Sequence, residues 1–565
     1  MNNIFHIGYK SFFIFCLILY GSSTTTGFSQ EKPNIIFILT DDQSYGMLGI
    51  TGNEIVSTPN LDKLANQGTL FTNAHVTSAI CTPSRISILL SQYERKHGVN
   101  FNSGTSVSNE AWEKSYPVVM RNSGYYTGWI GKNHTPVGKG GYSSGLMEKS
   151  FDYWYAGHGH LTFYPKDKHK IFNDAMADTQ VEIIQEGMNE FIDPNARKLK
   201  GAIHFLKERP IDKPFLLSVN FNLPHGAGTR SMEMRPTDDE IYRTLYRDQN
   251  IPLPDNYIAK KDIGTPKLPA TLFRVGDRQD GYSYVDTPTT LKETYIRQLE
   301  AMTGIDRLVG KLRDKLKDLK IGRKTIIIFT SDHGLFMGEQ GIGGKSLCYE
   351  KTTHVPLIIY DPSVAKKYKG LKSNALVQTI DIAPTILNYG GVQNPVTFQG
   401  KDLSSLVNGG QTSPREYVFT ENLWSTQFGN PRCEAVQNEE WKYIRYYKNE
   451  TFPASKKIET AKELEINLNK MLYAVHDPDI AIYRDYIESP LLGEEPVYEE
   501  LYNLKNDPQE LNNLIHEKQY EPMLRKLQSV WEKEIHKARG EGPPKVYRYT
   551  ADSEAESNNK SEPER

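Results

Sequence analysis

Residues 33–42 read PNIIFILTDD, an apolar run that ends in two adjacent aspartates. The part at residues 34–40 is apolar on both faces, which is typical of a strand buried in a parallel sheet. Four more runs have this character, at residues 126–131, 215–222, 325–330 and 355–360. We interpret the five runs as buried parallel strands. Helical stretches such as residues 299–319 lie between some of them, so the sequence predicts an α/β fold with a mainly parallel sheet covered by helices on both faces.

A second region begins after about residue 411. Short alternating runs at residues 417–420, 441–446 and 500–504 indicate strands, and residues 455–472 and 520–539 have helical patterns. We therefore expect a large domain at residues 30–410 and a smaller α+β domain with an antiparallel sheet at residues 411–550. Residues 551–565 lack large apolar side chains and are expected to be a disordered tail.

Charge and hydropathy exclude two classes of protein. The 565 residues include 67 Lys and Arg and 69 Asp and Glu, a net charge of −2, and a general nucleic-acid binder needs a basic excess. The mean hydropathy of −0.55 excludes a protein with many membrane spans. At the N-terminus, Lys10 precedes a short apolar run at residues 11–20 and then small and polar residues. This pattern predicts a cleaved signal peptide at residues 1–29, and therefore a periplasmic or secreted protein with no stable membrane insertion.

Cysteine is sparse in this chain. Removing the signal peptide with Cys16 leaves Cys81, Cys348 and Cys433. Three cysteines in an exported protein of this size do not form a disulfide framework. The sequence leaves open whether Cys348 and Cys433 pair or remain two buried thiols.

Polar side chains follow four of the predicted strands. Ligands of open parallel sheets bind beyond the carboxyl ends of the strands. Beyond these ends lie three acids, three histidines and two lysines, of which Lys345 comes thirteen residues after Asp332: Asp41, Asp42, Asp332, His134, His225, His333, Lys132 and Lys345. Each residue alone has an ordinary structural explanation, but packing does not explain all of them at one sheet edge.

The three acids indicate a metal ion. Converging carboxylates repel one another unless a cation is present, and oxygen ligands favour Ca²⁺ or Mg²⁺ over zinc. His333 is a less usual ligand for such an ion. The lysines and histidines add positive charge and hydrogen-bond donors. The predicted site therefore suits a tetrahedral oxyanion, either a sulfate ester or a phosphate ester.

Residues 81–85 read CTPSR, and Pro83 fits the first turn of a helix that begins at Cys81. The N-terminus of a helix lowers the pKa of a thiol, which suggests a thiolate nucleophile. Sulfur, however, is a poor partner for a hard ion held by carboxylates. The residues alone leave this conflict open, together with the simpler reading of Cys81 as a buried structural cysteine.

The segment from Cys81 to Arg85 resembles the signature of the formylglycine-dependent type I sulfatases of the alkaline phosphatase superfamily. The resemblance extends along most of the chain, at residues 33–42, 58–62, 131–134, 222–225, 330–334, 338–341, 344–345, 354–357, 381–385, 500–504 and 507–508. It implies an alkaline-phosphatase-like catalytic domain and a secreted bacterial polysaccharide sulfatase.

The resemblance also implies a mechanism. Cys81 would be oxidised to formylglycine by a formylglycine-generating enzyme or an anaerobic sulfatase-maturing enzyme, so that a hydrated aldehyde replaces sulfur beside the metal. One hydroxyl would attack the sulfate, and the second would then expel it and restore the aldehyde.

The roles carried over from the family cover the whole predicted cluster. Residue 81 would ligate the metal together with Asp41, Asp42, Asp332 and His333. Arg85 would orient the diol, and Lys132 and His134 would serve the diol and the sulfate. Lys345 and His225 would lie on the leaving-group side, with His225 as the general acid.

Four positions depart from the common family pattern. Leu90 and Ser91 replace a Thr-Gly pair, Asn133 replaces a tryptophan, and His333 replaces an asparagine. The last variant is familiar among carbohydrate sulfatases.

The sequence also offers weaker support for other functions. Gly344-Lys345-Ser346 resembles the end of a P-loop, but Glu339 stands where that motif needs glycine. A phosphoester hydrolase of the same superfamily would be expected to carry Ser or Thr at position 81. A non-catalytic carbohydrate-binding protein would result if Cys81 stayed unmodified.

The expected substrate is a sulfated carbohydrate, such as the algal polysaccharides ulvan and carrageenan or their oligosaccharides. The aromatic residues 153–155 are interpreted as part of a long loop that lines sugar subsites, with His158 and His160. Arg230 is expected to bind a carboxylate or a second sulfate.

Overall fold

The central sheet has eight strands and carries the predicted site at one edge. The computed structural model describes residues 32–100, 105–157, 201–225, 244–272, 282–423, 430–447 and 487–548, with residues 458 and 462. The strands follow the order β12 (Leu371–Ser373), β2 (Thr69–Phe71), β11 (Leu357–Tyr360), β8 (Thr325–Ser331), β1 (Asn34–Asp41), β7 (Phe215–Pro224), β5 (Tyr126–Lys132) and β6 (Tyr153–Gly157). This confirms the predicted mixed, mainly parallel sheet.

The strands in the middle of the sheet are parallel. β1 pairs in parallel with β7 on one side and β8 on the other, and β7 continues the parallel arrangement to β5 and β6. The prediction was wrong for the run at residues 355–360, because β11 is antiparallel to both β8 and β2. The strand begins only at Leu357, after Pro356, which has no N–H to donate to a ladder. A run that is apolar on both faces does not reveal its direction.

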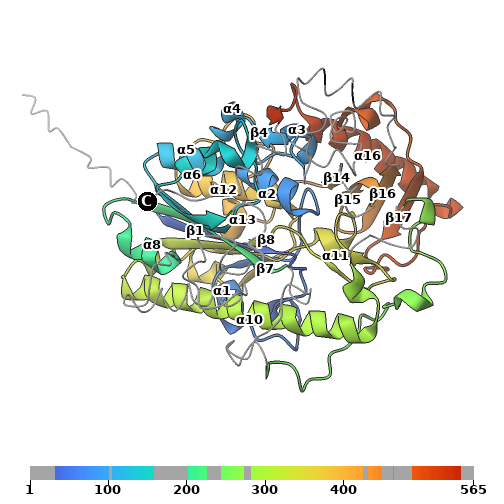
Figure 1. Ribbon diagram of the computed structural model, residues 1–565, viewed down its shortest axis with the longest axis horizontal. Coiled ribbons are helices and arrows are strands. Elements are labelled where there is room, and N and C mark those ends of the chain that lie inside the picture. The colour runs from blue at the N-terminus through green and yellow to red at the C-terminus, as the bar shows by residue number, and fades with distance from the viewer. Residues whose placement is uncertain are drawn as a thin grey trace, which may run out of the picture. The chain divides into compact units, whose positions relative to one another are not determined.

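Helices cover both faces of the sheet (Figure 1). One face carries α1 (Pro59–Gln67), α8 (Ala202–Glu208) and α10 (Pro288–Asp318), and the other carries α2 (Cys81–Leu90), α5 (Tyr116–Asn122) and α12 (Ile382–Tyr389). Ile36 and Ile38 of β1 belong to the first core, whereas Ile35, Phe37 and Leu39 belong to the second. This alternation follows from the period of two along a strand. The continuous apolar character of β1 therefore reflects burial on both sides.

The helix predicted at residues 299–319 is longer than expected. It corresponds to α10, whose N-cap is Thr287, where the side chain accepts a hydrogen bond from the peptide of Thr290. Pro288 occupies the first helical position, where its missing N–H costs nothing. Among the described residues, the remaining short α-helices are α3 (Glu94–His97), α4 (Asn109–Trp112), α6 (Leu146–Lys149), α11 (Glu350–Thr353) and α13 (Ser404–Val407).

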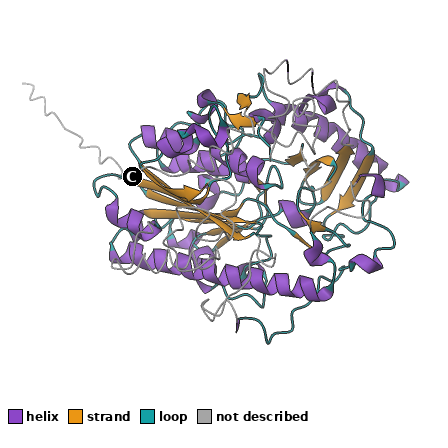
Figure 2. Cartoon of the chain, viewed as in Figure 1, coloured by secondary structure: helices purple, strands orange, loops and turns teal. Residues whose placement is uncertain are grey.

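The second sheet is antiparallel, as predicted (Figure 2). It contains β14 (Val418–Asn422), β15 (Arg432–Gln437), β16 (Trp441–Tyr447) and β17 (Tyr498–Asn503), and its apolar face packs against α16 (Glu521–Arg539). Strand β15 was not predicted, because its residues RCEAVQ are mostly polar or small. Both sheets belong to one compact unit that begins at Pro33. The domain boundary at residue 410 stays a prediction.

Several expectations fall outside the described residues. They concern the signal peptide at residues 1–29, the tail at residues 551–565, and almost all of the helix predicted at residues 455–472. In the part of the chain that the structure describes, no helix combines the length and the apolar character needed to cross a membrane.

Candidate active site

The three aspartates converge because β1 and β8 are neighbours in register. Thr40 of β1 pairs with Ser331 of β8, so both strands end side by side. The peptide of Asp332 donates to the carbonyl of Thr40 over 3.1 Å, and the peptide of Asp42 donates to Asp332 Oδ1 over 3.3 Å. Asp41, Asp42 and Asp332 are all buried. The register of two adjacent strands thus brings three buried carboxylates together.

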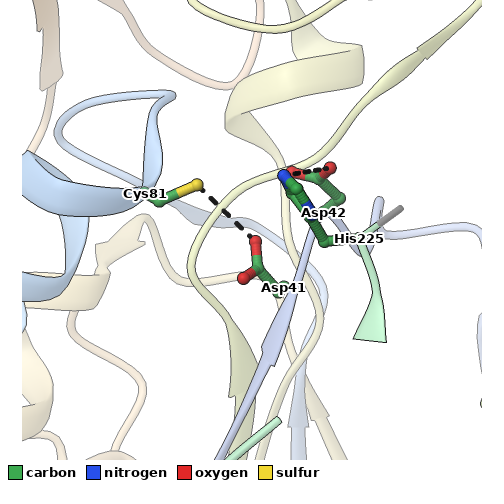
Figure 3. Close-up of side chains that lie close together, drawn as sticks. All are labelled: Asp41, Asp42, Cys81 and His225. Atoms are coloured by element: carbon green, nitrogen blue, oxygen red, sulfur yellow. Dashed lines mark hydrogen bonds and ion pairs between the residues drawn. The ribbon is translucent and has the colours of Figure 1, made fainter. Parts of the chain in front are cut away.

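Cys81 is the first residue of α2, as predicted, and its side chain is fully buried within this cluster. Its Sγ atom lies 3.7 Å from Asp41 Oδ1, 3.4 Å from His333 Nε2 and 3.1 Å from Lys345 Nζ. Figure 3 shows the thiol pointing from α2 toward the carboxylate of Asp41. The side chain at position 81 therefore lies among acidic and basic groups.

Arg85 lies one turn after Cys81 and on the same face of α2. Its Nε donates to Asp332 Oδ2 over 2.9 Å, and Nη2 lies 3.3 Å from Asp41 Oδ2. Burial lowers the pKa of Arg85, but Asp332 and Asp41 raise it by more. Nη1 is buried and has no hydrogen-bond partner among the described residues. The guanidinium thus bridges two carboxylates and keeps one nitrogen for a further acceptor.

Lys132, the last residue of β5, forms an ion pair with Asp41 and is fully buried. Burial alone would raise the pKa of Asp41, but Lys132, and after it His225 and Arg85, hold that pKa well below its usual value. His134 follows in the turn after β5, is buried, and has a left-handed backbone with a φ of 47°. Asp41 is therefore ionised and surrounded by cations.

Asp42 has a different environment. Its Oδ1 lies 2.9 Å from Lys345 Nζ and 3.3 Å from His333 Nδ1, yet burial raises its pKa despite both neighbours. Burial lowers the pKa of His333, but Asp332 raises it by more, to about 9. Asp332 therefore favours positive charge on this side of the cluster.

His225 lies on the open side of the cluster. It follows β7, and its peptide donates to the carbonyl of Asp41 over 3.1 Å. Its Nε2 is 3.8 Å from Asp42 Oδ2, and 21% of its side chain is exposed, against 6% for Asp42 (Figure 3). Of the two, His225 is the better placed to meet a molecule that arrives from solvent.

The donor set offers three carboxylates to a hard metal ion, together with two imidazoles and the thiol of Cys81. Two overlapping groups offer ligand atoms within 4.8 Å of one another: Asp41, Asp42, Cys81 and His225, and Asp41, Cys81, Asp332 and His333. Carboxylate oxygens predominate, which suits Ca²⁺ or Mg²⁺, whereas a thiol does not. An oxygen in place of the sulfur of residue 81 would complete a hard-ion site.

Two residues that were not predicted, Tyr284 and Asn430, hold the segment of Lys345 by hydrogen bonds. The hydroxyl of Tyr284 accepts from the peptide of Gly344 over 3.0 Å and donates to the carbonyl of Phe336 over 2.7 Å. Asn430 Nδ2 donates to the carbonyl of Lys345 over 2.8 Å. No local sequence pattern predicts these contacts, because the partners are distant in the sequence.

The C-terminal sheet supports the segment that leads into Cys81. The side chain of Thr420 donates to the carbonyl of Val76 over 3.0 Å, and the peptide of Glu421 donates to the carbonyl of Thr77 over 2.9 Å. Because both belong to β14, one edge of the second sheet fixes the approach to α2.

Ser91, one of the departures from the family pattern, ends α2 with a φ of 52°, a conformation that favours glycine. Its hydroxyl donates to the carbonyl of Ile380 over 2.8 Å and accepts from the peptide of Gly400 over 3.0 Å. These two bonds stabilise a serine where a glycine would adopt the turn more easily.

The expected sugar subsites are partly corrected. Tyr153 and Trp154 do not lie in a loop but on strand β6, and they are only 5% and 7% exposed. Trp154 packs against Trp129 and Phe151, so aromatic residues here complete a core. His158, His160 and Arg230 lie outside the described residues.

Comparison with protein families gives two matches. The family model named Sulfatase matches residues 33–392, and that of the N-sulphoglucosamine sulphohydrolase C-terminal region matches residues 338–468. An N-acetylglucosamine-6-O-sulfatase of Bacteroides thetaiotaomicron is 25% identical over 89% of this chain and 86% of its own length. An arylsulfatase of Clostridium perfringens is 25% identical over 89% and 94%. An ulvan-active sulfatase of Formosa agariphila is 26% identical over 79% and 82%.

Solved structures share the fold. A structure determined with its substrate D-glucosamine-2-N,6-O-disulfate has a TM-score of 0.64 and 20% identity, over 91% of this chain and 99% of that chain. A phosphonate monoester hydrolase from Silicibacter pomeroyi has a TM-score of 0.62 and 20% identity, over 89% and 95%.

The sulfatase model covers more than half of the chain and includes the whole cluster around Cys81. The fold and the curated relatives agree with it. The chain therefore belongs to the sulfatase family, as a type I sulfatase of the alkaline phosphatase superfamily that hydrolyses sulfate esters.

Proposed function

We propose that this sulfatase removes sulfate from a sulfated carbohydrate, namely an algal polysaccharide such as ulvan or carrageenan or its oligosaccharides. The reaction uses residue 81 as formylglycine and a divalent metal ion. The observation that carries the chemistry is the position of Cys81, whose sulfur lies close to Asp41, His333 and Lys345 at once. A formylglycine at position 81 would therefore lie next to the acids that would hold a cation and next to a lysine that would hold an anion.

The hydrated aldehyde of residue 81 would supply an oxygen nucleophile and would remove the mismatch between sulfur and a hard ion. Arg85 is suited to orient this group. It is fixed to Asp332 and Asp41, and it keeps Nη1 for a further acceptor.

Asp41, Asp42, Asp332 and His333 would hold Ca²⁺, or alternatively Mg²⁺, together with residue 81. When bound, the ion would supply positive charge to the nucleophile and to the sulfate oxygens. The burial of these carboxylates supports the assignment, because acids at this density need compensating charge.

The remaining residues act on the sulfate. Lys132, His134 and Lys345 would stabilise the charge that develops on the sulfate oxygens. His225 would donate a proton to the leaving oxygen of the sugar. The support for this role is its position at the exposed side of the cluster, 3.8 Å from Asp42.

Two kinds of relative support a carbohydrate substrate. One is named for N-acetylglucosamine-6-O-sulfate chemistry, and two are named as ulvan-active sulfatases. His158, His160 and Arg230 remain the residues we propose for contacts with the sugar. Export by the signal peptide at residues 1–29, followed by work in the periplasm or outside the cell, fits a polymeric substrate.

A phosphoester hydrolase is the alternative reaction. Its support is the shared fold of the phosphonate monoester hydrolase. A carbohydrate-binding protein without catalysis is the alternative outcome if Cys81 is not modified. Intact mass separates matured from unmatured protein, because conversion of this thiol to an aldehyde lowers the mass by about 18 Da, whereas the oxidation ladder of cysteine raises it.

The decisive experiment is a panel of sulfated oligosaccharides, with released sulfate measured by ion chromatography. The enzyme is co-expressed with a formylglycine-generating enzyme, and Cys81→Ala serves as the matched control. We expect sulfate from at least one ulvan or carrageenan oligosaccharide and none from the control. Turnover of aryl sulfates without release from any sugar would contradict the carbohydrate proposal. Turnover of phosphate esters alone would favour the alternative reaction.

A further inference from the structure

Cys348 and Cys433 lie together where the segment of Lys345 meets the C-terminal sheet. Their Sγ atoms are 3.4 Å apart, although 85 residues separate them in the sequence. Cys433 belongs to β15, and Cys348 lies between Lys345 and α11. Both side chains are almost completely buried, at 1% and 0% exposure.

We propose that Cys348 and Cys433 form a disulfide in the exported protein. A disulfide bond is about 2.05 Å long, so the sulfur atoms need to approach by little more than about 1 Å. After loss of Cys16 with the signal peptide and conversion of Cys81, these are the only two thiols that the sequence retains.

The surroundings favour a neutral, cross-linked pair over a metal site. Both sulfurs lie in an apolar cluster with Leu347, Tyr446 and Tyr502. Among the described side chains, the groups that are close enough together to share a metal ion include neither cysteine. Cysteine pairs in an oxidising compartment form disulfides, which is the environment that the predicted signal peptide implies.

The timing of the reaction follows from burial. Burial raises the pKa of the Cys348 thiol well above its usual value, and the neighbouring Cys433 adds to the effect. The thiolate is the reactive form, so the folded thiols exchange slowly. The bond therefore forms while the two segments dock, before the apolar cluster closes over them.

The chemical step balances through thiol–disulfide exchange. The thiolate of one cysteine attacks the disulfide of an oxidant, such as oxidised glutathione or a disulfide oxidoreductase, and forms a mixed disulfide. The second cysteine then displaces the oxidant sulfur. Two thiols of the chain lose two protons and two electrons, and the oxidant leaves with its disulfide reduced to two thiols.

The bond would reinforce an existing contact at the active site. Lys345 precedes Cys348 by three residues, and Asn430 precedes Cys433 by three. Asn430 already donates a hydrogen bond to the carbonyl of Lys345 over 2.8 Å. A covalent link next to this bond holds the backbone of Lys345 against the C-terminal sheet. It also restricts the unfolded chain, because it closes a long loop.

The test maps thiols in the full-length protein. The protein is exported to the periplasm of a bacterial host and denatured in iodoacetamide without reductant. We expect a peptide that links Cys348 to Cys433, with both residues alkylated only after reduction. Alkylation of both residues without reduction would overturn the proposal. This readout does not involve catalysis, so it stands or falls separately from the proposed function.

Thermal unfolding gives a second measurement with a matched control. Reductant is expected to lower the unfolding midpoint of the wild-type protein by several degrees. It should leave the midpoint of the Cys348→Ala/Cys433→Ala variant unchanged. An equal response of the two proteins to reductant would also count against the disulfide. If the variant does not fold, the peptide map of the wild-type protein decides alone.

Discussion

The ammonium group of Lys345 lies 3.1 Å from the sulfur of Cys81, and it also lies 2.9 Å from a carboxylate oxygen of Asp42. The lysine thus connects the position of the nucleophile to one of the acids that would hold a cation. Burial lowers the pKa of Lys345, but Asp42, followed by Cys81, raises it well above its usual value. Lys345 therefore stays charged beside the proposed nucleophile.

Replacing Lys345 by methionine removes this charge and keeps most of the side-chain volume. We expect kcat/KM for a sulfate ester to fall about 10²–10³-fold, the usual cost of losing a donor to a developing anion. Steady-state kinetics of the matured enzyme measure the effect. Lys369→Met, a change at an exposed lysine, is the control and should retain wild-type kinetics. Equal activity of the two variants would remove Lys345 from the mechanism.

Replacing His225 by alanine separates protonation of the leaving group from the rest of the reaction. Sugar alcohols are poor leaving groups and need a proton, whereas activated phenols do not. We expect His225→Ala to lose much more activity on a sulfated sugar than on an activated aryl sulfate. The ratio of the two kcat/KM values is the measurement. A proportional loss on both substrates would refute the assignment of His225 as general acid.

Removal of the metal ion is expected to abolish turnover and to lower thermal stability. Without the ion, Asp41, Asp42 and Asp332 lose a compensating charge in a buried cluster. A chelator titration followed by both activity and unfolding midpoint tests this, with Ca²⁺ and Mg²⁺ added back separately. Recovery with one ion identifies the cofactor. Undiminished turnover by protein shown to be free of metal would contradict the predicted metal site.

Tyr284→Phe tests the support of the Lys345 segment. The variant keeps the ring but loses the hydrogen bonds to Gly344 and Phe336, and leaving buried groups unpaired costs about 1–3 kcal/mol. We expect a lower kcat with little change in KM, because the lysine loses its fixed position. Tyr125→Phe is the matched control, since its hydroxyl donates to the carbonyl of Pro33, the residue before β1. If both variants behave alike in kcat, Tyr284 only stabilises the fold.

A buried lysine between two glutamates gives a prediction about pH. Lys442 Nζ lies 2.8 Å from Glu350 and 2.7 Å from Glu510. Burial raises the pKa of Glu350, but Lys442, together with two histidines, lowers it below the usual value. A lowered pKa means that the Glu350 carboxylate contributes stability above the pKa of the unfolded chain. This contribution is lost as the pH falls through the lower pKa of the folded protein.

Lys442→Met should lower the free energy of unfolding at pH 7.5 by about 3–5 kcal/mol, because it leaves the buried carboxylate of Glu510 and the partly exposed carboxylate of Glu350 without their cation. The deficit should shrink toward pH 5, since protonation then removes the unpaired charges. Urea unfolding at both pH values measures this. Lys537→Met, at a largely exposed lysine on α16, should change little at either pH. A deficit of the same size at both pH values would show that Lys442 acts mainly through packing.

The sequence predicted the part of the fold that depends on burial. The runs that became β1, β5, β7 and β8 are apolar because helices cover both of their faces. The same character hid the direction of β11, since an antiparallel strand between two neighbours is equally buried. Strand β15 was missed for the opposite reason: its polar residues, Arg432 and Glu434 among them, form ion pairs inside the molecule.

The site shows the same division. Asp41 and Asp332 were predicted to meet because parallel strands end at one edge, and the register of β1 and β8 brings them together. Tyr284 and Asn430 could not be predicted, because they act through single hydrogen bonds made across long distances in the sequence. Their roles depend on how loops fold over the sheet edge, and the spacing of apolar residues in the sequence does not predict how these loops fold.

The hydrogen bond from Thr420 to Val76 joins residues that are 344 positions apart. During synthesis the ribosome therefore makes Cys81 long before it makes the strand that fixes the segment in front of it. Until β14 has been made, the segment before Cys81 lacks this hydrogen bond. On a nascent chain that ends before β14, the segment is therefore accessible to other proteins. For the proposed conversion of Cys81, the order of translation would thus leave a period in which a maturing enzyme can reach this cysteine.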